Sequence, residues 1–476
     1  MQSPNRLERE TLRLKASHIK QTGLRLINCV DRKYLLTAGA MGLLYAVVTP
    51  PFQVPDEPNH FYRAYQVSSG EAFSTRQDDL LGGVLPRSLV RVVDDTAPNA
   101  GYDPTAKVSL SLTIDGFGRP LRASKTMFVH FPNTAIYSPI PYIPQAAGML
   151  LGRLLGLSPL ALLYLGRLAN LAVAALLCAV AIKIAPVFRG VLFLTATTPM
   201  FIYEAASVSA DALTDALSIL FIALILRSAF GPDPEVKRRD IALIMVTAML
   251  IGLCKNAYAI LALVFFIIPP EKLGSRVKYY AAGLSTCVLS GLASYWWLLS
   301  IKPLYVPYRG AANLNDPMNF ILGHPLLYTK MVIFNLLGHF VFYAGSFVGY
   351  LGWEDIRLPS LLIVLYVAAL CAAGALGGKG RISLRAKIIL GSVATVGIAL
   401  VITSQFIMGK PTGVNSIDKS QGRYFVPIAP LVFFLFASDK LAARFERYRL
   451  ARFVPTFAIA SLLVGLVFVI RRYYVP

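Results

Sequence analysis

A pair of adjacent carboxylates follows the first apolar run of the chain. Asp56 and Glu57 lie between two prolines in the stretch VPDEP, and His60 and Arg63 follow within two helical turns. A carboxylate can take the proton of an attacking hydroxyl, so the pair is a candidate general base, or a metal ligand, at the lipid boundary. The same two residues would also suit the start of a helix, where the dipole favours negative charge. The pair alone leaves both interpretations open.

The spacing D-E-x-x-H from Asp56 to His60 invites comparison with the zinc motif H-E-x-x-H. The first residue is an Asp and no obvious third ligand follows, so the comparison is weak. His60 lies four residues after Asp56 and Arg63 lies seven residues after it, so one helical face would present all three. His60 is therefore better interpreted as a hydrogen-bonding partner.

A second group of acids occurs in YEAASVSADALTDALSIL, which contains Glu204, Asp211 and Asp215. Asp211 and Asp215 are four residues apart and would share a helix face. Ionisable groups near a membrane segment are costly and therefore point to function, although a solvated helix start explains Asp211 as well. Together with Asp56, Asp211 would offer oxygen ligands to a divalent cation such as Mg²⁺ or Mn²⁺. No organic cofactor is expected.

Two cations occur where few are expected on the outer side of a membrane. Lys255 lies at the tip of an expected helical hairpin, and Arg423 lies in QGRYFVPIAP between Gln421 and Tyr424. Arginine suits a phosphate geometrically. The alternative is that both side chains extend toward lipid headgroups, with Tyr424 in the interfacial aromatic belt.

The composition indicates a membrane protein. Hydrophobic residues make up 56% of the chain and charged residues 15%, against about a quarter charged in soluble domains. Apolar stretches near 20 residues recur, long enough to cross about 30 Å of hydrocarbon. The net charge of +21 comes from short basic clusters between apolar runs, the pattern of cytoplasmic loops, so nucleic acid is not an expected partner. We expect an all-α polytopic membrane protein with about eleven spans, within a range of ten to thirteen.

The division of the chain follows from these runs. We expect a cytoplasmic basic tail over 1–33, a first span over 34–50, an outer loop over 51–158 and a multi-span domain over 159–476. Within the outer loop, KVSLSLTID (107–115) alternates like a strand and precedes the turn DGFG, which predicts a small β-hairpin.

Three further stretches are harder to assign as spans. Residues 137–159 carry four prolines and Arg153, which favours an interfacial helix. Residues 240–268 are expected to form two short helices that meet at Lys255. Residues 326–350 either span or lie flat.

Four stretches are similar to a bacterial family catalogued as predicted membrane proteins of unknown function. They are VPDEPNHFYRAYQVSSGE (54–71), YLGRLANL (164–171), GWEDIRLP (352–359) and QGRYFVPIAPL (421–431). An acidic pair after the first span, a long outer loop and a second acid in the next outer loop also resemble the GT-C superfamily. Its members are membrane glycosyltransferases that use polyprenyl-phosphate sugars, so the step from family to chemistry is by analogy.

The GT-C resemblance implies an inverting transfer from a polyprenyl-phosphate sugar to a cell-envelope glycan or lipid-linked acceptor. The reaction would occur on the periplasmic or extracellular face of a bacterial inner membrane. By this resemblance Asp56 takes the role of base, with Glu57 as the alternate. Asp211, near Glu204 and Asp215, supports a cation or the acceptor. Our assignment of phosphate-binding residues within this scheme is Arg423, Lys255, Arg63 and His60.

Two alternatives remain open. A lipid-linked glycan polymerase shares the outer-face chemistry, but a large late loop rich in Arg would be expected of it. A flippase or transporter predicts mid-membrane charges and two related halves, and no repeat is visible in the chain.

Overall fold

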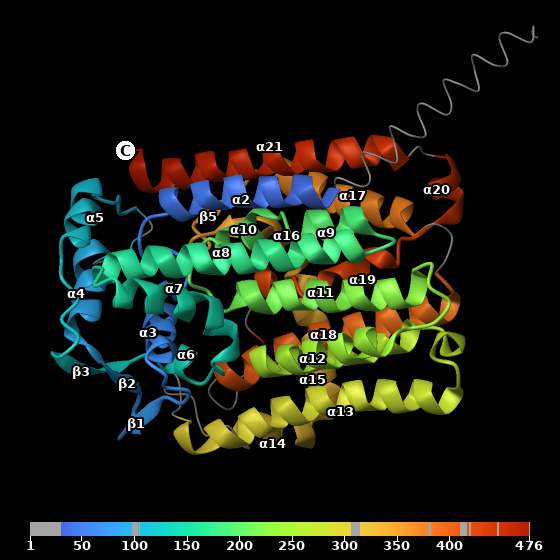
Figure 1. Cartoon of the computed structure of the whole chain (residues 1–476), viewed down its shortest axis with the longest axis horizontal. Coiled ribbons are helices and arrows are strands. Elements are labelled where there is room, and N and C mark those ends of the chain that lie inside the picture. Colours follow the sequence, from blue (N-terminus) through green and yellow to red (C-terminus); the bar gives the residue numbers. More distant parts are fainter. Residues whose placement is uncertain are drawn as a thin grey trace, which may run out of the picture.

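The computed structural model describes residues 30–97, 103, 105–305, 315–378, 382–409, 417, 420–444 and 447–475. Most of the expected basic tail, residues 1–29, lies outside them. The long helices run side by side along one direction, and a small sheet with several short helices covers one end (Figure 1).

Six helices in the described part of the chain are long and apolar enough to cross a membrane. Helices α14 (Asn315–Gly323) and α15 (Pro325–Gly338) would add a seventh as a broken span, bent by 108°. The expected count of about eleven is therefore not confirmed. The six are α8 (Pro159–Ile184), α11 (Asp211–Phe230), α13 (Arg276–Ile301) extended by η4 (Lys302–Leu304), α17 (Ser360–Gly377), α18 (Leu384–Gly409) and α21 (Arg447–Tyr474).

Short helices account for the missing spans. The expected outward pass over 190–206 is divided into α9 (Arg189–Thr195) and α10 (Pro199–Ala205), each covering only about 10 Å. The expected pass over 425–438 contains only α19 (Ala429–Phe434) as an α-helix. These pieces are buried among the longer helices, so their apolar character serves internal packing rather than contact with lipid.

Helix α2 (Val30–Val48) occupies the expected first span but differs from the six in charge. Asp31, Arg32 and Lys33 fall within any 18-residue window of this 19-residue helix. It packs against α8 and α21 within the bundle (Figure 1).

The expected break near Lys255 is confirmed. Helix α12 (Arg238–Cys254) ends directly before it, and the 3₁₀ segment η2 (Asn256–Ile267) begins directly after it. Residues 326–350 are divided between α15 and α16 (Phe340–Val348), so they do not form one continuous span.

We call residues 51–158 at one end of the molecule the cap. Its strands form an antiparallel sheet in the order β1-β2-β3. Helix α7 is about 18 Å long, too short to span a membrane, and packs on α3 and α8. The cap elements are α3 (Glu57–Ser68), β1 (Thr75–Gln77), β2 (Leu80–Pro86), α4 (Arg87–Thr96), α5 (Leu110–Phe117), β3 (Thr126–His130), α6 (Pro132–Ala135), η1 (Ile140–Tyr142) and α7 (Ile143–Leu154).

The strand predicted over 107–115 is wrong, because α5 begins at Leu110. Thr113 and Gly116, three residues apart, are the buried positions of this helix. Gly116 packs against Leu160 of α8, a contact that selects the helical period over the alternating one. The hairpin of the cap is formed instead by β1 and β2.

Candidate active site

The acidic pair marks the start of α3, but its two side chains do different things. Asp56 is the N-cap residue with φ of 59°, in the left-handed region, and its side chain makes no capping hydrogen bond. Instead its Oδ1 accepts a hydrogen bond of 2.9 Å from Asn133 Nδ2. Left-handed backbone at a non-glycine residue costs on the order of 1 kcal/mol and is often found at functional sites. The alternative that Asp56 merely caps the helix does not fit this geometry.

Glu57 is committed to a buried ion pair. Its Oε2 lies 2.6 Å from Arg167 Nη2 and its Oε1 lies 2.8 Å from Arg167 Nε, and both side chains have no exposed surface. Arg167 also donates to the backbone oxygens of Ala46, Thr49 and Pro50 at the end of α2. This contact ties α2, α3 and α8 together, so Glu57 has a structural role, whereas Asp56 is not part of this ion pair.

The second acidic group meets the two expected cations. Arg423 Nη1 lies 2.5 Å from Glu204 Oε1, and Arg423 Nε lies 3.9 Å from Asp211 Oδ2. Lys255 Nζ is hydrogen-bonded to Asp211 Oδ1. Asp215 lies one helical turn further along α11 and is 4% exposed. Four chain segments thus converge on one largely buried cluster, which we call the charged cluster: Glu204, Asp211, Asp215, Lys255 and Arg423.

Aromatic rings surround the cations of the charged cluster. Lys255 Nζ lies 4.5 Å from the centroid of the Tyr424 ring and 5.6 Å from that of Tyr137. Arg423 Cζ lies 5.1 Å from the Tyr424 ring, and Tyr258 donates a 2.7 Å hydrogen bond to the backbone oxygen of Tyr424. Tyr424 therefore packs inside the protein against both cations rather than in a membrane-facing belt.

His60 and Tyr137 connect the start of α3 to the charged cluster. His60 Nδ1 lies 2.7 Å from the hydroxyl of Tyr142. Burial lowers the pKa of His60 to about 3, with Asp211 opposing that shift. Burial raises the pKa of Tyr137 to about 12, and the field at its hydroxyl includes contributions from Asp211 and Asp56. Asp56 directly follows Pro55, which lines a small pocket together with Arg423, so Asp56 lies next to the charged cluster.

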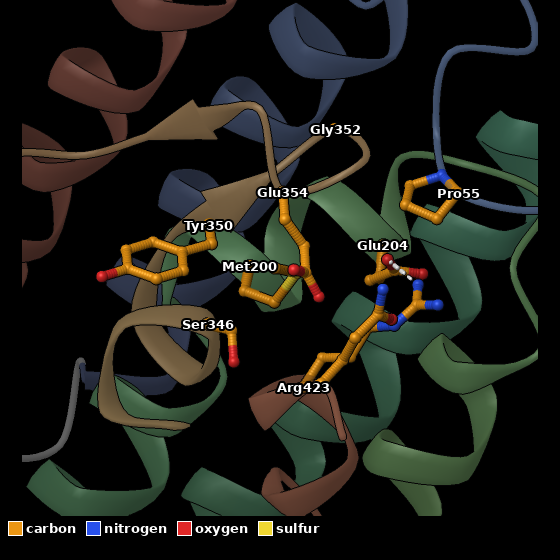
Figure 2. Close-up of a pocket in the computed structure, with 9 residues that line it drawn as sticks. Pro55, Met200, Glu204, Ser346, Tyr350, Gly352, Glu354 and Arg423 are labelled. Carbon is orange, nitrogen blue, oxygen red and sulfur yellow. Dashed lines mark hydrogen bonds and ion pairs between the residues drawn. The ribbon is translucent and has the colours of Figure 1, made fainter. Parts of the chain in front are cut away.

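A small pocket opens beside the charged cluster (Figure 2). Its volume of about 10 Å³ accommodates about one water molecule. Figure 2 shows Glu354 extending into it from the turn between β4 (Tyr350–Leu351) and β5 (Ile356–Arg357). The lining residues are Pro55, Met200, Glu204, Ser346, Tyr350, Gly352, Glu354, Gln421 and Arg423.

Three buried polar atoms at this pocket lack a hydrogen-bond partner among the described residues: Glu204 Oε2, Gln421 Oε1 and Arg423 Nε. Leaving a buried polar atom unpaired costs about 1–3 kcal/mol. Two acceptors and one donor converging on a pocket of this size are therefore suited to one water molecule, or to a single hydroxyl or anionic oxygen of a larger ligand.

A model of the family described as predicted membrane protein DUF2142 matches residues 40–432. The chain belongs to the DUF2142 family. No curated protein and no solved structure matches it. The four stretches that carried the family resemblance lie within the match, and three of them contribute Pro55, Glu354, Gln421 and Arg423 to the pocket of this DUF2142 protein.

Arg63, expected as a phosphate-binding residue, has neutral partners. It donates to Gln66 Oε1 and to the backbone oxygens of Ala72 and Tyr137 over 2.6–2.9 Å. Burial lowers the pKa of its guanidinium to about 10. In this DUF2142 protein Arg63 therefore holds the cap around the site rather than facing the pocket.

The expected cation site between Asp56 and Asp211 gains no support from the donor set. Both oxygens of Asp211 face positive side chains, Lys255 and Arg423. Across the described ranges, no three His, Cys, Asp or Glu side chains are grouped so that they would hold a metal ion.

Sequence reasoning missed three residues of the site. Arg167 is a charged residue inside an apolar run, which by itself indicates a buried partner. Asn133 carried no signal, because its contact with Asp56 spans 77 positions. Glu354 lies in GWEDIRLP, and its φ of 69° is visible only in the folded chain.

Proposed function

We propose that this DUF2142 protein is an inverting glycosyltransferase. It moves a sugar from a polyprenyl-phosphate donor to a cell-envelope glycan or lipid-linked acceptor at the cap end of the membrane. The observation that carries the proposal is a pocket with unpartnered polar atoms that Pro55 and Arg423 line. Asp56 directly follows Pro55 in the chain, and Lys255 pairs with Asp211 in the adjoining charged cluster. A carboxylate near two cations is what base-assisted attack and departure of a phosphate require.

The charge distribution supports the orientation of the site. Helix α20 (Asp439–Arg444) lies at the end of the molecule opposite the cap (Figure 1), and basic residues occur at the helix termini of that end. They include Lys183, Arg238 and Arg239. Because cytoplasmic loops are enriched in Lys and Arg, the cap and the site belong on the periplasmic or extracellular face in this proposal.

In the reaction, the acceptor hydroxyl oxygen attacks C1 of the donor sugar from the side of Asp56. The new C1–O bond forms as the C1–O bond to the phosphate breaks, with inversion at C1. The hydroxyl proton passes to an Asp56 carboxylate oxygen, and the bonding electrons leave with the polyprenyl phosphate. Arg423 and Lys255 stabilise its charge, a type of interaction worth several kcal/mol in other enzymes.

The resting site must change its ion pairs for this step. Arg423 and Lys255 are paired with Glu204 and Asp211 in the free protein. Arg423 Nε has no hydrogen-bond partner among the described residues, so it is the first donor available to an incoming phosphate oxygen. The acids Glu204 and Asp211 are then free to accept hydroxyl protons of the sugars as hydrogen bonds.

The test measures release of free polyprenyl phosphate from a panel of polyprenyl-phosphate sugars by purified protein in liposomes. Wild type is compared with Asp56→Asn and with Asp79→Asn. Asp79 is a matched control because its side chain is 97% exposed in the cap. Turnover lost only in Asp56→Asn supports the transferase. Equal turnover in all three proteins removes Asp56 as the base, and no turnover with any donor contradicts the function.

One observation favours a second candidate, a transporter of lipid-linked glycans. Asp215 is 4% exposed within the membrane-spanning helix α11, near the ion pairs of Asp211 and Arg423. Buried ionisable groups in spans are typical of proton-coupled transporters. A transport assay in the same liposomes distinguishes the two, because transport without release of polyprenyl phosphate supports this candidate alone.

A further inference from the structure

A second pocket lies in the cap, and it is strongly cationic. Its volume is about 300 Å³, and it shares no lining residue with the pocket of Figure 2. Five of its seven lining side chains are positively charged and none is negative. We call it the cationic pocket, and its lining residues are Arg87, Ser88, Arg91, Arg119, Pro120, Arg122 and Lys125.

The cations of this pocket are mostly without counter-charges. Arg119 pairs with Asp95. In the part of the chain that the structure describes, no carboxylate lies within ion-pair distance of Arg91, Arg122 or Lys125. Like charges held around one cavity repel each other, and a bound anion removes that cost.

Backbone contacts build the pocket from two segments. The N–H of Arg87 donates to the backbone oxygen of Lys125 over 2.8 Å, and the N–H of Arg122 donates to Ser88 Oγ over 3.2 Å. The walls are thus the first turn of α4 and the segment between α5 and β3. No side chain caps the N-terminus of α4, so the positive end of its dipole adds to the same field.

An apolar helix adjoins the cationic pocket. Helix α5 packs on the first turns of the membrane-spanning helix α8, where Gly116 contacts Leu160 and the Phe117 ring stacks on Tyr164 at 5.4 Å. This contact places α5 beside the first turns of a helix that is long and apolar enough to cross a membrane. Helix α5 exposes four large apolar side chains: Leu110, Leu112, Ile114 and Phe117.

Arg119 follows Phe117 after one residue, so the apolar face and the cationic pocket are contiguous. Apolar side chains at the membrane boundary with cations beside them match the two halves of a lipid, its chain and its anionic headgroup. A soluble polyanion would account for the cations but not for the exposed face of α5.

We propose that the cationic pocket binds the phosphate-bearing headgroup of a membrane lipid, with α5 against the lipid's hydrocarbon chain. Arginine side chains and the N-terminus of α4 bind the phosphate oxygens. The ligand is a phospholipid or a polyprenyl diphosphate, which share this chemistry. The proposal stands on geometry outside the candidate active site and does not depend on glycosyl transfer.

The test titrates delipidated full-length protein in detergent with phosphatidylglycerol, phosphatidylcholine or polyprenyl diphosphate, and native mass spectrometry counts bound lipid. The variant Arg91→Gln/Arg122→Gln is compared with the control Arg76→Gln/Lys302→Gln. The control removes the same number of positive charges. Its two residues, Arg76 and Lys302, are exposed and lie outside the cationic pocket. Arg91→Lys/Arg122→Lys retains the charge, and thermal unfolding verifies that all variants are folded.

We expect wild type to bind an anionic lipid at least tenfold more tightly than phosphatidylcholine. The Arg91→Gln/Arg122→Gln variant should lose about tenfold in affinity, with the control within twofold of wild type. Tighter binding of phosphatidylglycerol or of polyprenyl diphosphate identifies the source, and either supports the proposal. Equal losses in variant and control overturn it. Displacement of bound lipid by inorganic pyrophosphate at the affinity of the lipid itself assigns the pocket to soluble anions and also overturns it.

Discussion

Glu57 and Arg167 form a doubly hydrogen-bonded ion pair that is fully buried between α3 and α8. Removing one partner of such a pair leaves a buried charge, which costs roughly 3–5 kcal/mol. We therefore expect Glu57→Ala or Arg167→Ala to lower the melting temperature of the purified protein sharply. The double variant Glu57→Leu/Arg167→Met should recover part of the loss. Single variants that melt like the exposed-site control Asp79→Asn would contradict this role.

Asp56 differs from its neighbour because its conformation is unfavourable and its side chain does not cap α3. Asparagine tolerates the left-handed region and can still accept a hydrogen bond from Asn133. Asp56→Asn should therefore stay within about 0.5 kcal/mol of wild type in stability. Its turnover should fall by about 10²–10⁴, the usual contribution of a general base.

Asp56→Gly provides a second check on the same position. Glycine adopts the left-handed backbone freely, so this variant should be at least as stable as wild type while remaining inactive. Thermal unfolding and release of polyprenyl phosphate, measured on the same samples, separate the two effects. An active Asp56→Gly enzyme would exclude the carboxylate as base.

Arg423 is expected to contribute to both stability and donor binding. Arg423→Gln leaves Glu204 and Asp211 without this cation in a buried site, so it should destabilise the protein by roughly 3–5 kcal/mol. Arg423→Gln/Glu204→Gln should recover much of the stability but not the turnover. Arg423→Lys retains the charge and should raise KM for the donor more than it lowers kcat, because its point charge lacks the planar donor set. Recovery of turnover in the double variant would mean that Arg423 serves packing only.

The sequence predicted the members of the site better than their contacts. The carboxylate pair after the first apolar run indicates Asp56, and the cost of charge near a span indicates Glu204 and Asp211. Lys255 and Arg423 are indicated because few cations are expected on the outer side of a membrane. The fold brings the last four together in the charged cluster. That Glu57 pairs with Arg167 across 110 positions depends on how α3 and α8 pack, which no local pattern reports.

The same limit explains where the predicted fold differs from the structure. Hydropathy cannot distinguish a span from a short buried helix. It therefore predicts membrane passes over 190–206 and 425–438, where the structure has the short helices α9, α10 and α19. Apolar and polar residues alternate along the sequence of α5, as in a strand. The segment is nevertheless helical, because a helix allows Gly116 to pack against α8. Tertiary packing overrode the local pattern in both cases.

Chelation tests the expected cation at the acidic residues. Because Lys255 and Arg423 already face both oxygens of Asp211, we expect EDTA to change turnover by less than twofold. Lys255→Gln should then affect turnover far more than chelation does, since it removes a charge that stabilises the leaving phosphate in the proposed reaction. Loss of turnover in EDTA that Mg²⁺ or Mn²⁺ restores would instead assign a metal to the site.

His60 should make the stability of the protein depend on pH in one direction. Its pKa is lowered from the usual 6.5 to about 3 by burial, so between these values the unfolded chain binds a proton that the folded chain does not. The contribution of His60 to the free energy of unfolding is then constant above pH 6.5. It falls as the pH drops below 6.5, by up to about 1.4 kcal/mol per pH unit. His60→Gln removes this titration. Melting temperatures of both proteins from pH 7.5 to pH 5 should therefore diverge only on the acid side, and parallel curves would mean that His60 takes up its proton in the folded state.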